Sequence, residues 1–251
     1  MDSFNFVIIF IVLACFALVS VSVINSQQTR KRLIAQRIVQ LRRKVSEYEE
    51  LASTIETYTG STTIERVVLD EIVDSLHGML QLEPDNLTID LSIANTKARI
   101  QEIQAPGYTC QIHRTLESDA AIARAQYMIS EAGRIIRKRQ AANQLELSEM
   151  TSYIGDLAWA HLCVAMISLI AQGHRAVRRG DVLKGYSFYK RAQQAAMEST
   201  ISDDRRHQII KELTDIQSNR KKSISPALMP ETHLNPDNVD IDIEPPSPAE
   251  E

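Results

Sequence analysis

The uncharged run from Phe6 to Ile24 places the strongest constraint on what this chain can fold into. Its 19 residues are all apolar except for two serines. A helix of this length reaches about 28 Å, which is close to the roughly 30 Å of a bilayer's hydrocarbon core. A helix is also the only single segment that satisfies its own backbone hydrogen bonds in lipid. The run therefore predicts a transmembrane anchor over residues 1–25.

Two other interpretations of this run stay open. A cleaved signal peptide starts with a positively charged region, whereas residues 1–5 carry Asp2 and no Lys or Arg, although Ser20-Val21-Ser22 loosely resembles a cleavage site. A buried helix of a soluble protein is apolar on one side, and no such one-sided pattern occurs here. The anchor remains the preferred interpretation of the run.

A block of positive charge follows the apolar run. Between Asn25 and Ser46 there are seven basic residues and no acid: Arg30, Lys31, Arg32, Arg37, Arg42, Arg43 and Lys44. The positive-inside rule predicts a single-pass protein with its N-terminus outside and its bulk in the cytoplasm, at a plasma membrane, or the inner membrane of a bacterium. Near anionic lipid each basic residue contributes about 1 kcal/mol, so we expect these seven to contact the membrane surface. A nucleic-acid tether is the less favoured alternative, because Tyr48 is the only aromatic residue nearby.

Residues 26–60 form a basic neck with a heptad pattern. Apolar residues recur at alternating steps of four and three over Ile34, Ile38, Leu41, Val45, Tyr48, Ala52 and Ile55. This spacing predicts a coiled-coil seam on a helix that continues from the membrane. The seam has two possible partners, a second copy in a homodimer or the chain's own later helices.

Residues 61–222 predict a cytoplasmic helical domain. Thr62 and Glu65 resemble a capping box, and the segments 84–86 and 105–107 break the helices. No alternating run of strand length occurs, so the fold class is all-α. The 15-residue apolar run Leu157–Ala171 is short for a membrane span and predicts a buried core helix, with a second pass as the alternative.

The stretch 166–199 resembles one tetratricopeptide repeat. It has small residues at Gly173, Gly180 and Gly185, an aromatic at Tyr189 and an alanine at Ala192. It departs from that family at four positions, namely Leu169, Gln172, Ala176 and Met197. The flanking segments do not repeat the pattern, and such arrays need about three units. The resemblance implies a helical hairpin, and peptide binding less directly, while close helix approach at Gly173 and Gly185 follows from their lack of a side chain.

Catalytic and metal-binding patterns are weak in this chain. Cys110 and His113 have metal-like spacing, but a structural zinc site needs four ligands and no second pair lies nearby in the sequence. No phosphate-binding, dinucleotide or nucleophile-elbow motif is present. We therefore expect no cofactor and no enzyme activity. A membrane-tethered helical enzyme or metal protein is the alternative.

Residues 223–251 predict a disordered acidic tail with seven acids, six of the chain's eight prolines, and no Lys or Arg. Within it, Val239, Ile241 and Ile243 alternate with acids, a pattern that suits docking on a partner's sheet edge. A purely solubilising tail is the alternative. Together the segments predict a membrane-anchored adaptor or scaffold that recruits an unidentified cytoplasmic protein, and the net charge of −4 hides opposite charge blocks at the neck and the tail.

Overall fold

The structure, a computed structural model, describes residues 2–201 and 203–231, except for the side chains of residues 2–15 and 17–24. Within these residues the chain is all-helical with no strand, as the sequence predicts. The seven helices are α1 (Asp2–Thr59), α2 (Thr62–Leu82), α3 (Leu87–Ile103), α4 (Asp119–Ala141), α5 (Leu147–Arg178), α6 (Val182–Glu198) and α7 (Asp204–Gln217).

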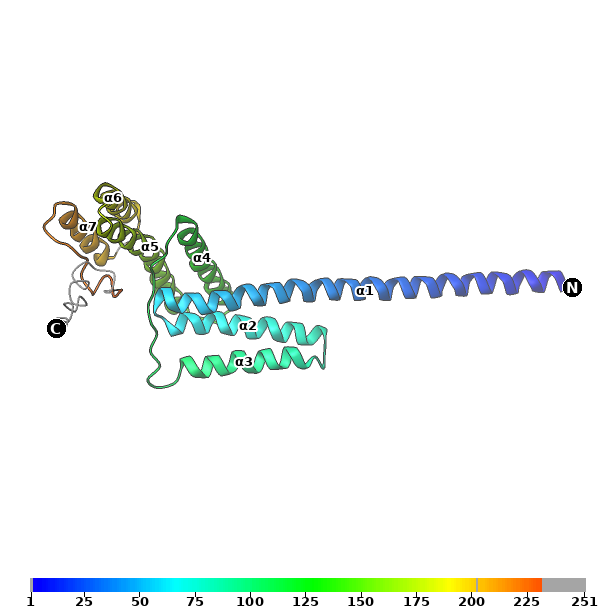
Figure 1. Ribbon diagram of the computed structural model, residues 1–251. Coiled ribbons are helices and arrows are strands. Elements are labelled where there is room, and N and C mark those ends of the chain that lie inside the picture. The colour runs from blue at the N-terminus through cyan, green and yellow to red at the C-terminus, as the bar shows by residue number, and fades with distance from the viewer. Residues whose placement is uncertain (1, 202, 232–251) are drawn as a thin grey trace, which may run out of the picture.

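Helix α1 is one continuous helix of 58 residues, about 87 Å long at 1.5 Å per residue. Its N-terminal part projects away from the other helices, while its C-terminal part lies along α2 (Figure 1). It ends at Thr59, directly before Gly60, whose φ of +69° suits glycine. Ser61 then caps α2 by accepting a hydrogen bond from the Ile64 amide. The predicted capping box is wrong in detail, because the N-cap is Ser61 rather than Thr62.

The heptad-patterned side of α1 packs on the chain's own helices. Ile38, Val45, Tyr48, Ala52 and Ile55 are buried in a core formed with α2, α3, α4 and the first half of α5, and Ile34 and Leu41 pack against its edge. Helix α2 runs antiparallel to α1, and α3 runs antiparallel to α2, so the three lie side by side with α2 in the middle (Figure 1). Within one chain, the seam is therefore occupied by intramolecular contacts.

Helix α5 passes from this first core into a second one. The second core contains the C-terminal half of α5 together with α6, α7 and residues 224–229. By length and composition α5 is the one helix, among the described residues, that is apolar enough to cross a membrane. However, 67% of its most apolar stretch is buried inside the protein, in line with the expected core helix over residues 157–171.

Two glycines bring α5 and α6 into close contact. A Cβ atom at Gly173 would lie 2.4 Å from Cε1 of Tyr189, and one at Gly185 would lie 2.3 Å from Cγ2 of Val177. The turn between the helices has Gly180 at a φ of +84° and Asp181 as the N-cap of α6. The predicted helical hairpin with close approach is thus present, whereas the tetratricopeptide resemblance itself stays a prediction.

The first part of the predicted tail belongs to the fold. Ile224, Leu228 and Met229 are buried in the second core, and Glu231 is 3% exposed beside Arg114. The predicted start of disorder at residue 223 is therefore wrong, because three apolar side chains in this segment are buried members of the second core. The proposed docking residues Val239, Ile241 and Ile243 lie outside the described residues.

Candidate functional site

The basic residues of α1 divide into two groups in the structure. Six of them are exposed to solvent, namely Arg30, Lys31, Arg32, Arg37, Arg42 and Arg43. Lys44 is the exception, because its Nζ atom lies 3.1 Å from Oε1 of Glu71 and over the ring of Tyr48. Arg43 forms an exposed ion pair with Glu47 one turn further along. The C-terminal end of the basic block is therefore engaged with the helical body rather than free.

Glu71 of α2 links α1, α2 and α4 through ion pairs at the C-terminal end of this basic block, and we call this cluster the Glu71 clamp. Its side chain is 3% exposed and accepts hydrogen bonds from Lys44 of α1 and from Lys138 and Arg139 of α4. Arg139 also pairs with Asp74 at 2.8 Å. Burial alone raises the pKa of Glu71, but hydrogen bonds from Lys138 and Lys44 outweigh burial and hold this pKa below its ordinary value. A charged Glu71 thus fixes the direction in which α1 leaves the body.

A second network of buried charged residues lies at the C-terminal end of α1. Arg99 of α3 donates to Glu65 at 3.0 Å, to Glu56 at 2.8 Å and to the Tyr108 hydroxyl at 2.9 Å. Glu56 and Glu65 are only 7% and 1% exposed, so the single guanidinium of Arg99 pairs with two buried carboxylates. Cys110 closes the network by donating to the carbonyl oxygen of Glu56 at 3.3 Å. This arrangement ties the last turns of α1 to α2 and α3.

The buried Glu65 makes the free energy of unfolding depend on pH. Burial raises the pKa of Glu65 to about 7, with Arg99 opposing the shift and Glu56 adding to it. Between the ordinary value of 4.5 and about 7, the folded chain holds a proton that the unfolded chain has lost. The free energy of unfolding should therefore fall as pH rises through this window, by up to about 1.4 kcal/mol per unit. Denaturant titrations at several pH values should show this slope flattened in Glu65→Gln and kept in Glu49→Gln, a change at an exposed acid of α1 outside the Arg99 network. Equal slopes in the two variants would contradict the prediction.

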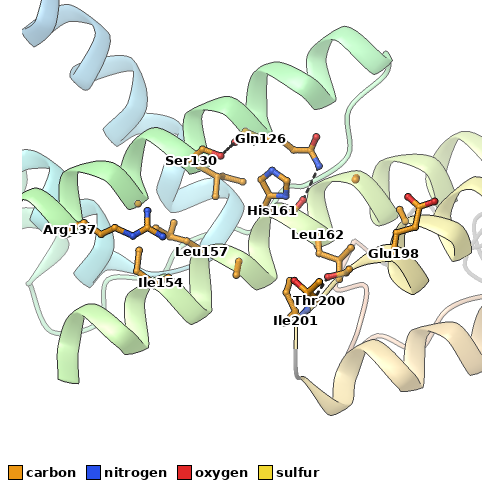
Figure 2. A pocket seen from close by; sticks show the side chains of 16 residues that line it. Gln126, Ser130, Arg137, Ile154, Leu157, His161, Leu162, Glu198, Thr200 and Ile201 are labelled. Atoms are coloured by element: carbon orange, nitrogen blue, oxygen red, sulfur yellow. Dashed lines mark hydrogen bonds between the residues drawn. The ribbon is translucent and has the colours of Figure 1, made fainter. Parts of the chain in front are cut away.

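A pocket of about 580 Å³ opens where the two cores meet along α5. Its floor is apolar and buried, with Ile129 of α4 and Leu157, Leu162 and Ala165 of α5. Gln126 holds one wall by donating to the carbonyl oxygen of His161 at 3.3 Å. Figure 2 shows Leu157 and Leu162 at the opening, with Gln126 on one side and Thr200 and Ile201 on the other.

The ends of the pocket carry opposite charges. Arg137 of α4 and Glu198 of α6 are both exposed lining residues, and Figure 2 shows them on opposite sides of the apolar floor. Gln194 donates to Glu198 at 2.7 Å, which orients that carboxylate. Such an arrangement suits an apolar peptide segment that is acidic at one end and basic at the other.

The residues considered for metal binding lie apart from this pocket. Cys110 is bound into the Arg99 network, where burial raises the pKa of its thiol to about 12, and His113 faces Thr115. No group of three His, Cys, Asp or Glu side chains suited to a metal ion occurs in the part of the chain that the structure describes.

Sequence reasoning missed the buried charged residues. Glu71, Glu65, Arg99 and Arg114 were not candidates, although one signal for Glu71 was available. Glu71 falls on the same side of α2 as Ile64, Val68 and Met79, at helical steps from them. An acid on such an apolar side needs a cationic partner when it is buried. The partners themselves lie 27 to 68 residues away and follow no local pattern.

Set against protein-family models, curated proteins and solved structures, the chain matches none of them.

Proposed function

We propose that this protein is a single-pass membrane-anchored scaffold, which holds a helical body at the cytoplasmic face and recruits a partner protein there. The observation that carries this proposal is the shape of α1, one unbroken helix with a projecting N-terminal part and a clamped C-terminal part (Figure 1). The projecting part contains the uncharged run 6–24, whose only described side chain, Phe16, is 71% exposed. A projecting helix with an uncharged sequence of this length suits a bilayer, whose hydrocarbon core matches its length.

The projecting part of α1, which we call the stalk, determines which basic residues lie close to lipid. With residue 24 at the membrane surface, Arg30–Arg32 lie about 9–12 Å away along the helix, whereas Arg42–Lys44 lie about 27–30 Å away. Because the Debye length is about 8 Å at physiological salt, a perpendicular stalk leaves only the first group close to anionic headgroups. Lys44 then serves the Glu71 clamp instead. The body would be held about 20 Å from the surface, since Ile38 is the first buried seam residue.

The pocket between α4, α5 and residues 198–201 supports a recruitment role. Its apolar floor and oppositely charged ends suit the mixed-charge apolar segment described above. A rigid stalk would keep this opening at a fixed height above the bilayer. The acidic residues 232–251 add a second possible contact for a basic partner surface.

The anchor is tested by placing charges in the apolar run. Arginine near the centre of a membrane helix costs about 2.5–3.5 kcal/mol, so Leu13→Arg combined with Phe16→Arg should move most of the full-length protein from membranes into the alkaline-carbonate supernatant. Leu183→Arg on α6 is the matched control, because Leu183 is 87% exposed on the body and should leave the protein in the pellet. A double variant that stays in the pellet overturns the anchor, and points to α5 as the membrane element.

A further inference from the structure

Helix α3 has two apolar stripes on opposite sides. The inner stripe packs in the first core through Ile89, Ile93, Ile100 and Ile103. The outer stripe consists of Leu87, Leu91, Ala94 and Ala98, which are all exposed, with Leu87 at 77% and Leu91 at 65%. Figure 1 shows α3 at the outer edge of the body, with α2 between it and α1. Burying two leucines here would remove apolar surface from water.

The outer stripe has the spacing of a coiled-coil seam. Its steps are four, three and four residues, which places Leu87 and Ala94 at d positions and Leu91 and Ala98 at a positions. The alanines allow a second helix to approach closely. A partner helix would thus contact a continuous strip along α3.

The charges beside the stripe indicate what that partner is. Lys97 occupies a g position and Glu102 the e position five residues later. Glu102 holds Arg99 of its own chain at 3.0 Å through Oε2, and with a side chain 61% exposed it still faces outward beside the stripe. In a parallel pair of α3 helices, Lys97 of each chain lies next to Glu102 of the other, so the two-fold axis produces two ion pairs. Asp90 and Asn95 have the same g-to-e relationship and can share a hydrogen bond. The surface is therefore complementary to a second copy of itself.

The direction of α1 selects the parallel arrangement. Helix α3 runs in the same direction as α1 (Figure 1), so a parallel α3 pair points both α1 helices toward the same side. An antiparallel pair would point the two α1 helices in opposite directions, which two chains anchored in one membrane cannot satisfy. This step rests on the proposed anchor, and confinement to one membrane would also raise the local concentration of the chains.

We propose that the protein forms a parallel homodimer through the outer face of α3, with Leu87, Leu91, Ala94 and Ala98 as its seam and Lys97–Glu102 pairs on both sides. The heptad-patterned side of α1 takes no part in this dimer, because its side chains are buried within each chain.

The first test uses the complete chain reconstituted in phosphatidylcholine vesicles. Ala94→Cys should give a disulfide-linked dimer under mild oxidation well above the wild-type background, whereas Leu183→Cys on exposed α6 should not. Adding Leu91→Asp to Ala94→Cys should reduce cross-linking at least tenfold without changing helical content by circular dichroism. Equal cross-linking at positions 94 and 183 overturns the proposal. Vesicle flotation of each variant reports the anchor separately, so loss of flotation with intact cross-linking in detergent contradicts the anchor and not the α3 contact.

The second test exchanges the charges. Lys97→Glu and Glu102→Lys, each in the Ala94→Cys chain, should each lower cross-linking because like charges then face each other. Co-reconstituting the two variants should restore it, since every pair across the mixed dimer becomes attractive. Failure to restore overturns the parallel pairing, because an antiparallel pair would place Lys97→Glu against Asp90 instead.

Discussion

Replacing Arg114 with alanine is expected to lower the free energy of unfolding by about 3–5 kcal/mol, because it leaves Glu231 as an uncompensated buried charge. The two side chains are 7% and 1% exposed. Arg114 donates to the Glu231 carboxylate from its backbone amide at 2.9 Å and from Nε at 3.2 Å, and its carbonyl oxygen accepts from Ser168. This pair fixes residues 223–231 against α5. Denaturant unfolding of the full chain in detergent measures the change.

An exposed ion pair is the matched control for Arg114. Arg175 and Glu117 lie 2.9 Å apart with side chains 31% and 86% exposed, so Arg175→Ala should cost at most about 1 kcal/mol. The double change Arg114→Leu with Glu231→Leu should recover most of the loss, since it removes both charges and fills similar space. If Arg114→Ala lowers the free energy of unfolding no more than Arg175→Ala does, the prediction that Arg114 and Glu231 form a stabilising buried ion pair is wrong.

Glycine-to-alanine changes are expected to alter the free energy of unfolding in opposite directions at different positions of the α5–α6 hairpin. Gly173→Ala and Gly185→Ala should each destabilise the fold by about 1–3 kcal/mol, because the new methyl group overlaps its neighbours. At Gly173 the neighbour is Tyr189, which is 4% exposed and hydrogen-bonded to His174 at 2.8 Å, so its ring cannot readily move. At Gly185 the backbone oxygen of Gly173 lies 3.2 Å from the new Cβ.

Gly155 is the control for this pair, because it lies on α5, as Gly173 does, and no atom lies within 4 Å of its Cβ position. Gly155→Ala should stabilise the protein by about 0.5–1 kcal/mol through helix propensity alone. Thermal unfolding of the three variants measures the signs. Stabilisation by all three would mean that α5 and α6 do not pack as closely as the structure has them.

Local patterns in the sequence were enough for the fold class and for several element boundaries. The heptad spacing of α1, the break at residues 84–86 and the Gly180–Asp181 turn each depend on neighbouring residues alone, so each can be read from a short window. The lack of alternating runs likewise predicted an all-helical chain correctly. The start of the disordered tail was wrong because Pro-rich composition hid Ile224, Leu228 and Met229, whose burial depends on a core formed elsewhere.

The sequence by itself determined that this chain has an uncharged membrane-length run, a basic heptad-patterned helix and a helical body. Only the tertiary structure decided what that helix packs against and which charges are buried. Its seam packs against the chain's own α2 and α4, and Lys44 forms an ion pair with Glu71 of α2. The physical reason is that periodicity specifies which face of a helix is buried, whereas its partner is chosen by packing and ion pairs between residues far apart in the chain, such as Arg114 and Glu231.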